Sequence, residues 1–218
     1  RFYKELFGRE YPFGKYDQVF VPEHNYGAME NVGCVTYNEN YMYRGESPSL
    51  SKRLRFSITN LHELAHMWFG NLVTMKWWDD LWLNESFATY MSFLAMSQSP
   101  ELAYFDTAGA LSYSTNSGHK HRLAFSTHPI CAVITRTDEA ESLFDGISYG
   151  KGSSFLKQVY KVIGHEALKA GLHDTSKSMN GKTQHCLTSL AACNGLMTTS
   201  VTNQWVKILT SLTGVILG

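Results

Sequence analysis

The sequence predicts an α+β fold, in which a few short strands precede a set of helices, and two patterns support this. Residues 17–22 alternate as a strand does, and residues 27–43 hold a second extended stretch over Val32–Tyr37. Beyond residue 49 the apolar side chains recur at helical spacing. An order in which strands come first and helices follow is typical of α+β domains.

Turn residues separate the first elements. Residues 1–7 have the apolar pattern of one face of a short helix, and Gly8 and the tripeptide at 12–14 are expected to form turns before the strand at 17–22. The chain starts at Arg1, without Met, and with this helix already under way. We therefore expect it to be a piece of a longer polypeptide.

A long helix is predicted to begin after Ser49 or Ser51, either of which can cap it, and to end at Phe69 before Gly70. Its apolar positions recur at helical spacing, and we expect them to face a core: Leu54, Ile58, Leu61, Ala65 and Phe69. The tryptophans at and beyond its C-terminal end are also predicted to be core residues: Trp68, Trp77, Trp78 and Trp82.

Two more helices are predicted further along the chain. One spans 83–97 and ends before Pro100, and the other follows Gly150. Between them, the polar stretch 106–128 indicates loops. From Ala167 onward Ser, Thr, Asn and Gly are frequent and the helical signal is weak.

The composition favours one globular domain, 1–218, and excludes some function classes. A chain of 218 residues with 44% hydrophobic residues is long enough to bury its own core. Its 19 basic and 19 acidic residues cancel, so no whole-chain field favours nucleic acid as a partner. It contains no apolar run of about eighteen residues, so we predict no transmembrane segment.

The four cysteines leave the compartment of the protein open. They are widely spaced and include no Cys-x-x-Cys pair, so we expect small apolar side chains, with a disulfide as the alternative: Cys34, Cys131, Cys186 and Cys193. A cytoplasmic setting is slightly favoured. The ectodomain of a membrane-anchored full-length protein is the alternative.

The main functional signal is the pentapeptide from His62 to His66. Two histidines at positions i and i+4 share one helical face and can bind one metal ion. Glu63 then lies beside the metal without binding it, where it can take a proton from a bound water. Catalytic zinc has three protein ligands, and Glu85, nineteen positions after His66, is the candidate third. The alternative is a helix with two solvated or core histidines.

The remaining acids and histidines carry weaker signals. Asp80 could orient a zinc-binding imidazole, although its spacing alone does not assign that role. The other histidines have no ligand spacing and are predicted to be surface or core residues: His24, His119, His121, His128, His165, His173 and His185.

The run from Leu61 to Ala88 closely resembles the gluzincin aminopeptidases, the family of aminopeptidase N and puromycin-sensitive aminopeptidase. The segments 68–74 and 82–88 carry this resemblance together with the histidine pair. It extends over about 2–163, whereas 164–218 diverges and is weakly assigned. The resemblance implies a thermolysin-like zinc metallopeptidase catalytic domain, a small mixed sheet plus helices, with one Zn²⁺ per chain on His62, His66 and Glu85.

A second match to this family is Gly27-Ala28-Met29-Glu30-Asn31, its exopeptidase signature. The resemblance implies that these five residues bind substrate. The glycine lets a strand edge approach a peptide, and Glu30 offers its carboxylate to a free α-ammonium group. Without the resemblance, Glu30 would be interpreted as a surface acid.

A third match is the segment from Phe144 to Gly152. In the family, the tyrosine of this segment donates its hydroxyl to the developing oxyanion, and the resemblance gives that role to Tyr149. The alternative for a single tyrosine is a core or rim position.

The expected function is therefore that of a zinc aminopeptidase acting on peptides with a free N-terminus. Two alternatives stay open: an inactive homologue serving as a binding or structural subunit, and a zinc endopeptidase, which Glu30 disfavours. Ser92 departs from the family, because many relatives carry glutamate there. The family's full-length members also have an N-terminal β domain and a helical C-terminal domain, and both are missing from this chain.

Overall fold

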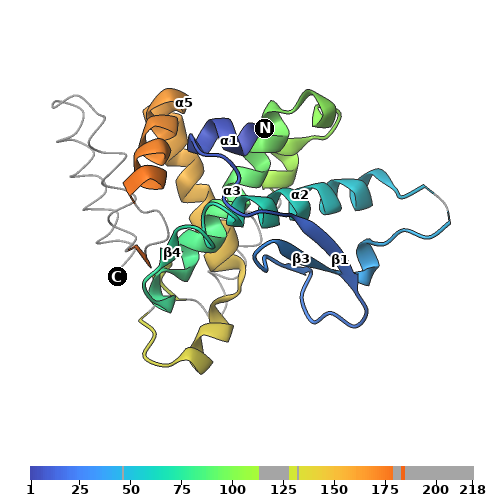
Figure 1. The fold of residues 1–218 in the computed structure, drawn as a ribbon, viewed down its shortest axis with the longest axis horizontal. Coiled ribbons are helices and arrows are strands. Elements are labelled where there is room, and N and C mark those ends of the chain that lie inside the picture. Colours follow the sequence, from blue (N-terminus) through green and yellow to red (C-terminus); the bar gives the residue numbers. More distant parts are fainter. Residues whose placement is uncertain (46, 113–127, 132, 179–182, 185–218) are drawn as a thin grey trace.

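The structure is a computed structural model, which describes residues 1–45, 47–112, 128–131, 133–178 and 183–184 (Figure 1). In chain order its helices and strands are α1 (Phe2–Phe7), β1 (Asp17–Val21), β2 (Ala28–Met29), β3 (Cys34–Asn38), η1 (Glu39–Tyr41), α2 (Leu50–His66), β4 (Thr74–Met75), η2 (Trp78–Asp80), α3 (Leu81–Gln98), η3 (Pro100–Leu102), η4 (Thr137–Leu143), η5 (Ile147–Lys151), α5 (Gly152–Ser178) and β5 (Thr183–Gln184).

The main sheet is small and mixed, as expected. Its strand order is β1-β3-β2, with β1 parallel to β3 and β2 antiparallel to β3. The β2 pairing joins Ala28 to Tyr37 and Met29 to Thr36, so the predicted substrate segment forms one edge of the sheet. A second pair, β4 with β5, is parallel. Sheet and helices together confirm the α+β class.

Helix α3 lies at the centre of the helical part, in contact with α2, η5 and α5 (Figure 1). Nearly every side chain from Leu81 to Met96 is buried. A helix that is apolar on all sides is stable only inside a protein, which explains its central place. It starts two residues before the predicted 83–97 helix, directly after η2.

Helix α2 begins at its predicted cap but ends before Phe69. The Ser49 hydroxyl accepts a hydrogen bond from the backbone N–H of Lys52, at 3.4 Å. After His66 the backbone tightens, because the N–H of Met67 bonds to the carbonyl three residues back. Gly70 then takes a φ of 131°, a conformation that favours glycine. A Cβ there would also lie 2.9 Å from Nδ1 of His66.

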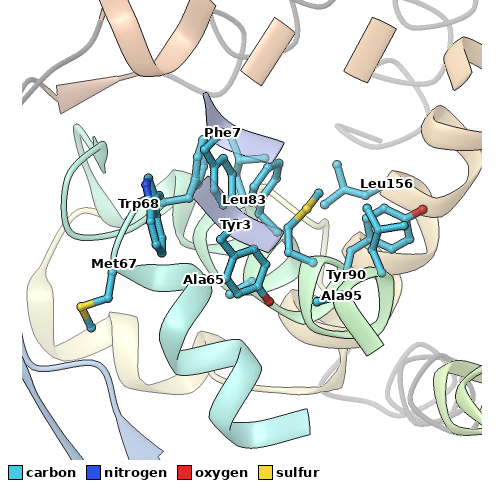
Figure 2. Packing of buried hydrophobic residues seen from close by; sticks show 14 of the residues in the cluster. Tyr3, Phe7, Ala65, Met67, Trp68, Leu83, Tyr90, Ala95 and Leu156 are labelled. Atoms are coloured by element: carbon cyan, nitrogen blue, oxygen red, sulfur yellow. The ribbon is translucent and has the colours of Figure 1, made fainter. Parts of the chain in front are cut away.

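Aromatic side chains of α1 form the core with the turn after α2. The ring of Phe7 stacks on Trp68, with ring centroids 5.7 Å apart, and Tyr3 also contacts Trp68 (Figure 2). Trp82 is buried as predicted, but the prediction was wrong for Trp77 and Trp78, which are 42% and 37% exposed. The indole N–H of Trp77 donates instead to a backbone carbonyl in the loop before η4, that of Ile134.

The predicted inward face of α2 divides into two parts. Ala65 and the following Phe69 are buried in the core. Ile58 and Leu54, about two and three turns nearer the N-terminus than Ala65, line a cleft instead. The apolar residues therefore share one face of the helix, as predicted, but the N-terminal half of that face borders a cleft and not the core.

The later part of the chain is more helical than expected. The third helix begins with the π-helical turn η5 at Ile147 and continues to Ser178, broken only at Gly164, where φ is 81°. Residues 107–112 are helical as well, whereas 113–127 of the predicted loop lie outside the described residues. No helix in the described part of the chain is long and apolar enough to cross a bilayer.

Candidate metal centre

Helices α2 and α3 bring the predicted metal ligands together. Nε2 of His62 lies 2.9 Å from Nε2 of His66, and Oε2 of Glu85 lies 3.2 Å and 3.5 Å from those two atoms. His66 and Glu85 are buried, and His62 is nearly so. The helix pair α2–α3 therefore forms a three-donor group on buried, packed elements.

This spacing matches what tetrahedral zinc requires. Bonds of about 2.0–2.1 Å at tetrahedral angles place two neighbouring ligand atoms about 3.3–3.4 Å apart. The observed separations of 2.9, 3.2 and 3.5 Å lie around that value. The donor set of two imidazoles and one carboxylate is also a common one for catalytic zinc. The residues present thus fit the metal that the sequence predicted.

The outward nitrogens of both imidazoles have partners that orient the rings. Nδ1 of His66 lies 3.2 Å from the carbonyl oxygen of Phe69. A carbonyl can only accept, so Nδ1 carries a proton and Nε2 is the nitrogen left to bind a metal ion. Nδ1 of His62 lies 3.3 Å from the hydroxyl of Thr89 on α3. Phe69 and Thr89 therefore orient the imidazoles, the role for which the sequence had suggested Asp80.

The electrostatics of the group favour a cation. Burial alone would raise the pKa of Glu85, but the facing imidazoles of His66 and His62 outweigh it and hold the pKa well below its ordinary value. Burial alone would lower the pKa of His66, and Glu85 reverses that shift. A buried carboxylate kept ionised between two imidazoles provides negative charge where a metal ion would bind.

Glu63 is buried beside the donor group and differs from Glu85. Burial raises the pKa of Glu63 to about 7, although the neighbouring imidazoles of His62 and His66 oppose that shift. Its Oε2 has no hydrogen-bond partner among the described residues. A carboxyl group with a pKa near neutrality can both accept and return a proton, which is the property of a general base.

A cleft of about 1100 Å³ connects the donor group to the β2 edge of the sheet. Gly27, Ala28, Met29 and Glu30 line it together with two of the donor residues, His62 and Glu85. Asn31 does not line it: its side chain donates to Thr36 and its carbonyl accepts from Cys34, so it holds the turn between β2 and β3. Four of the five predicted substrate residues thus border the cleft.

The carboxylate of Glu30 lies close to the α2 side of this cleft. One donor atom each from Glu30, Glu63 and His66 lie within 4.8 Å of one another. The amide of Asn71, in the turn after α2, donates to the backbone carbonyl of Glu30 at 2.8 Å. That bond joins the sheet edge to the turn that follows the histidine pair. The sequence did not predict it, although Asn71 lies within the segment 68–74 that carries the family resemblance.

Tyr149 lies on the π-helical turn η5 and lines the same cleft. Its ring stacks on that of His62, with centroids 5.9 Å apart and planes 20° apart. Burial and the nearby carboxylates, chiefly Glu85, raise the pKa of its hydroxyl, so the phenol stays protonated and can donate. Single π-helical turns occur preferentially at functional sites.

Two contacts that the sequence did not reveal hold η5 in place. Oδ1 of Asp145 accepts from the N–H groups of Ile147 and Ser148, at 2.9 and 3.1 Å. The hydroxyl of Ser86, next to Glu85 on α3, donates to the carbonyl of Ser148. A Cβ at Gly152 would collide with Ser86, so glycine there permits the close approach. These contacts fix η5, and with it Tyr149, against α3.

The other sequence signals are placed outside the donor group. Cys34 and Cys131 are free and half-buried, while Cys186 and Cys193 lie outside the described residues. Ser92, the position at which the resemblance implied a departure from the family, is fully buried, and its hydroxyl donates to the carbonyl of Thr89 at 2.7 Å.

Comparison with known proteins agrees with this geometry. The model of the peptidase family M1 domain matches residues 1–205, further than the resemblance extended by inspection. The chain is 40% identical to "Probable aminopeptidase 2" of Sulfurisphaera tokodaii over 94% of its own length and 26% of that protein. It is 47% identical to "Aminopeptidase N" of Streptomyces lividans over 78% of its length and 20% of that protein.

A plant relative gives the same picture. Identity to "Aminopeptidase M1-D" of Oryza sativa subsp. japonica is 40% over 94% of the chain and 24% of that protein. The chain thus spans about a quarter of the length of the curated relatives it matches. Peptidases of family M1 are in general zinc-dependent, and the chain belongs to this family.

Proposed function

We propose that this chain carries the catalytic centre of a zinc aminopeptidase, which hydrolyses the first peptide bond of substrates with a free N-terminus. The observation that supports it best is that one cleft is lined both by His62 and Glu85, which lie against His66 in the donor group, and by Glu30. Relatives across 94% of the chain are named aminopeptidases, which favours the same reaction.

In this proposal one zinc ion is held by His62, His66 and Glu85. When bound, zinc polarises the substrate carbonyl and lowers the pKa of a water molecule at its open position. The chain itself orients the ligands: Phe69 fixes the ring of His66 and Thr89 that of His62. Such outer contacts keep the donor atoms in place before the metal arrives.

Glu63 and Tyr149 carry the proton and charge movements. Glu63 accepts a proton from the attacking water and later returns it to the leaving amine, a cycle suited to its raised pKa. The hydroxyl of Tyr149 donates a hydrogen bond to the oxygen of the attacked carbonyl as negative charge develops there. Both side chains border the cleft within reach of the donor group.

Glu30 sets the position of cleavage in this proposal. Its carboxylate holds the substrate's α-ammonium group, which fixes the cleaved bond as the one after the first residue. Strand β2, which ends directly before Glu30, can also pair with an extended peptide backbone. We propose residues 1–218 as one catalytic domain, completed in the full-length protein by N- and C-terminal domains.

A test requires the full-length protein. Metal analysis of the wild type should give one zinc per chain, and His66→Ala should lose most of it while its circular dichroism stays native. Hydrolysis of a free dipeptide amide but not of its N-acetyl derivative would support the aminopeptidase. Cleavage of both would favour an endopeptidase, and cleavage of neither, with zinc bound, would favour an inactive homologue.

A further inference from the structure

We infer that Glu30 and Glu63 form a second divalent-cation site next to the zinc ligands, and that a cation bound there excludes the substrate's α-ammonium group. The inference rests on the proposed function, since it assigns an inhibitory occupant to the proposed ammonium pocket. Two groups of donor atoms in the described residues could hold an ion, and Glu30, Glu63 and His66 make up the second.

The two groups share His66, and that decides how a second ion would be held. Nδ1 of His66 is used by its hydrogen bond to Phe69, so only Nε2 remains to bind an ion. Once Nε2 binds the first ion, the second ion has the carboxylates of Glu30 and Glu63, completed by solvent. A site made of carboxylate and water oxygens suits hard divalent cations such as Mn²⁺.

A buried acceptor without a partner supports the site independently of the acidic residues' proximity. Glu63 is only 5% exposed, and its Oε2 has no hydrogen-bond partner among the described residues. Leaving such an acceptor unpaired is costly, and a cation held with Glu30 would satisfy it. Glu30 is half-exposed and lines the open cleft, so an ion can enter from solvent.

Because of charge balance, we expect the Glu30–Glu63 site to bind a divalent cation more weakly than the site on His62, His66 and Glu85 does. Two divalent ions would face three carboxylates, those of Glu30, Glu63 and Glu85, within one cleft. The second ion therefore binds with partial compensation and with fewer protein ligands than the first. We expect it to load only after the first site is full, and to leave more readily.

The occupied second site would block the proposed reaction in two ways. The ion would take the lone pairs with which Glu63 accepts a proton, and it would neutralise the carboxylate with which Glu30 holds an ammonium group. Ion and substrate amine would then compete for one anionic pocket. A substrate whose amine is acetylated cannot compete, because it has no charge to offer Glu30.

The test measures binding in the full-length protein, loaded with one equivalent of zinc. Mn²⁺ is titrated in and its free fraction followed by electron paramagnetic resonance, because zinc holds the imidazole site more tightly than Mn²⁺ does. One Mn²⁺ should bind, and Glu30→Gln should weaken it at least ~10-fold, as expected for losing one of two charged ligands. Glu101→Gln, which changes an exposed acid on η3, is the matched control and should bind Mn²⁺ as the wild type does.

A competition experiment identifies the pocket. Leucinol, an amine that cannot be hydrolysed, should displace the bound Mn²⁺, and N-acetyl-leucinol should not. Unchanged Mn²⁺ affinity in Glu30→Gln, no saturable Mn²⁺ binding in the wild type, or displacement by both compounds alike would overturn the inference. None of these readouts needs turnover. Absence of peptidase activity would therefore count against the proposed function, whereas the Mn²⁺ measurements would still decide whether the second cation site exists.

Discussion

The two walls of the cleft are built differently. The α2–α3 wall holds its functional groups on long, buried helices, where His66, Glu63 and Glu85 are at most 5% exposed. The β2 wall holds Glu30 directly after a two-residue strand, half-exposed and fixed by a hydrogen bond from Asn71. In the proposed function, the groups that hold the metal thus lie on buried helices, whereas Glu30, proposed to bind the chain end, lies on an accessible edge.

Among the variants of the α2–α3 wall, Glu63→Gln should lower the peptidase rate most. The amide keeps the size of the side chain but cannot take a proton, so kcat should fall by roughly 10²–10⁴-fold. Zinc content should stay at the wild-type level, because Glu63 is not among the proposed ligands. Turnover within a factor of a few of wild type would show that another group is the base.

Tyr149→Phe should remove one hydrogen bond to the developing oxyanion. The expected loss is roughly 10²–10³-fold in kcat, the usual effect of one such donor. KM should change much less, since the hydroxyl acts mainly in the transition state. A rise in KM with unchanged kcat would instead assign Tyr149 to substrate binding alone.

Glu30→Gln sharpens the comparison because it acts on the other wall. Loss of a charge pair in a partly dry cleft should cost about 2–4 kcal/mol of transition-state binding for free-amine peptides. N-acetyl peptides cannot form the pair, so the selectivity between the two substrates should collapse. Glu63→Gln, by contrast, should lower the rate for both substrates alike. An intact selectivity ratio in Glu30→Gln would mean that the chain end is recognised elsewhere.

The sequence predicted the functional residues of the α2–α3 wall better than the contacts that support them. The i, i+4 histidines and Glu85 follow from helix geometry and zinc chemistry, and the structure brings them together. The exposure of Trp77 and the early end of α2 could not be predicted, because both depend on which backbone groups a loop offers in space.

The groups that position Tyr149 escaped prediction for a similar reason. Asp145 caps η5 locally, but Ser86 reaches it from α3, 62 residues away in sequence. No local pattern encodes such a contact. The family resemblance identified Tyr149 itself, whereas its supports required the packing of η5 against α3.

The smallest effect concerns Thr89, which orients His62 from α3. Thr89→Val keeps the shape of the side chain and removes only the hydroxyl that lies 3.3 Å from Nδ1 of His62. Loss of such an outer partner typically weakens metal binding by about 10–100-fold, so zinc affinity measured by chelator competition should fall by that amount.

Two further variants make the Thr89 result specific to the hydroxyl. Thr89→Ser keeps the donor and should restore most of the affinity. Thr175→Val removes another buried hydroxyl, on α5, and should leave zinc binding unchanged while costing some stability. Wild-type zinc affinity in Thr89→Val would show instead that packing alone orients His62, and that the helical wall needs no outer hydrogen bond at this ligand.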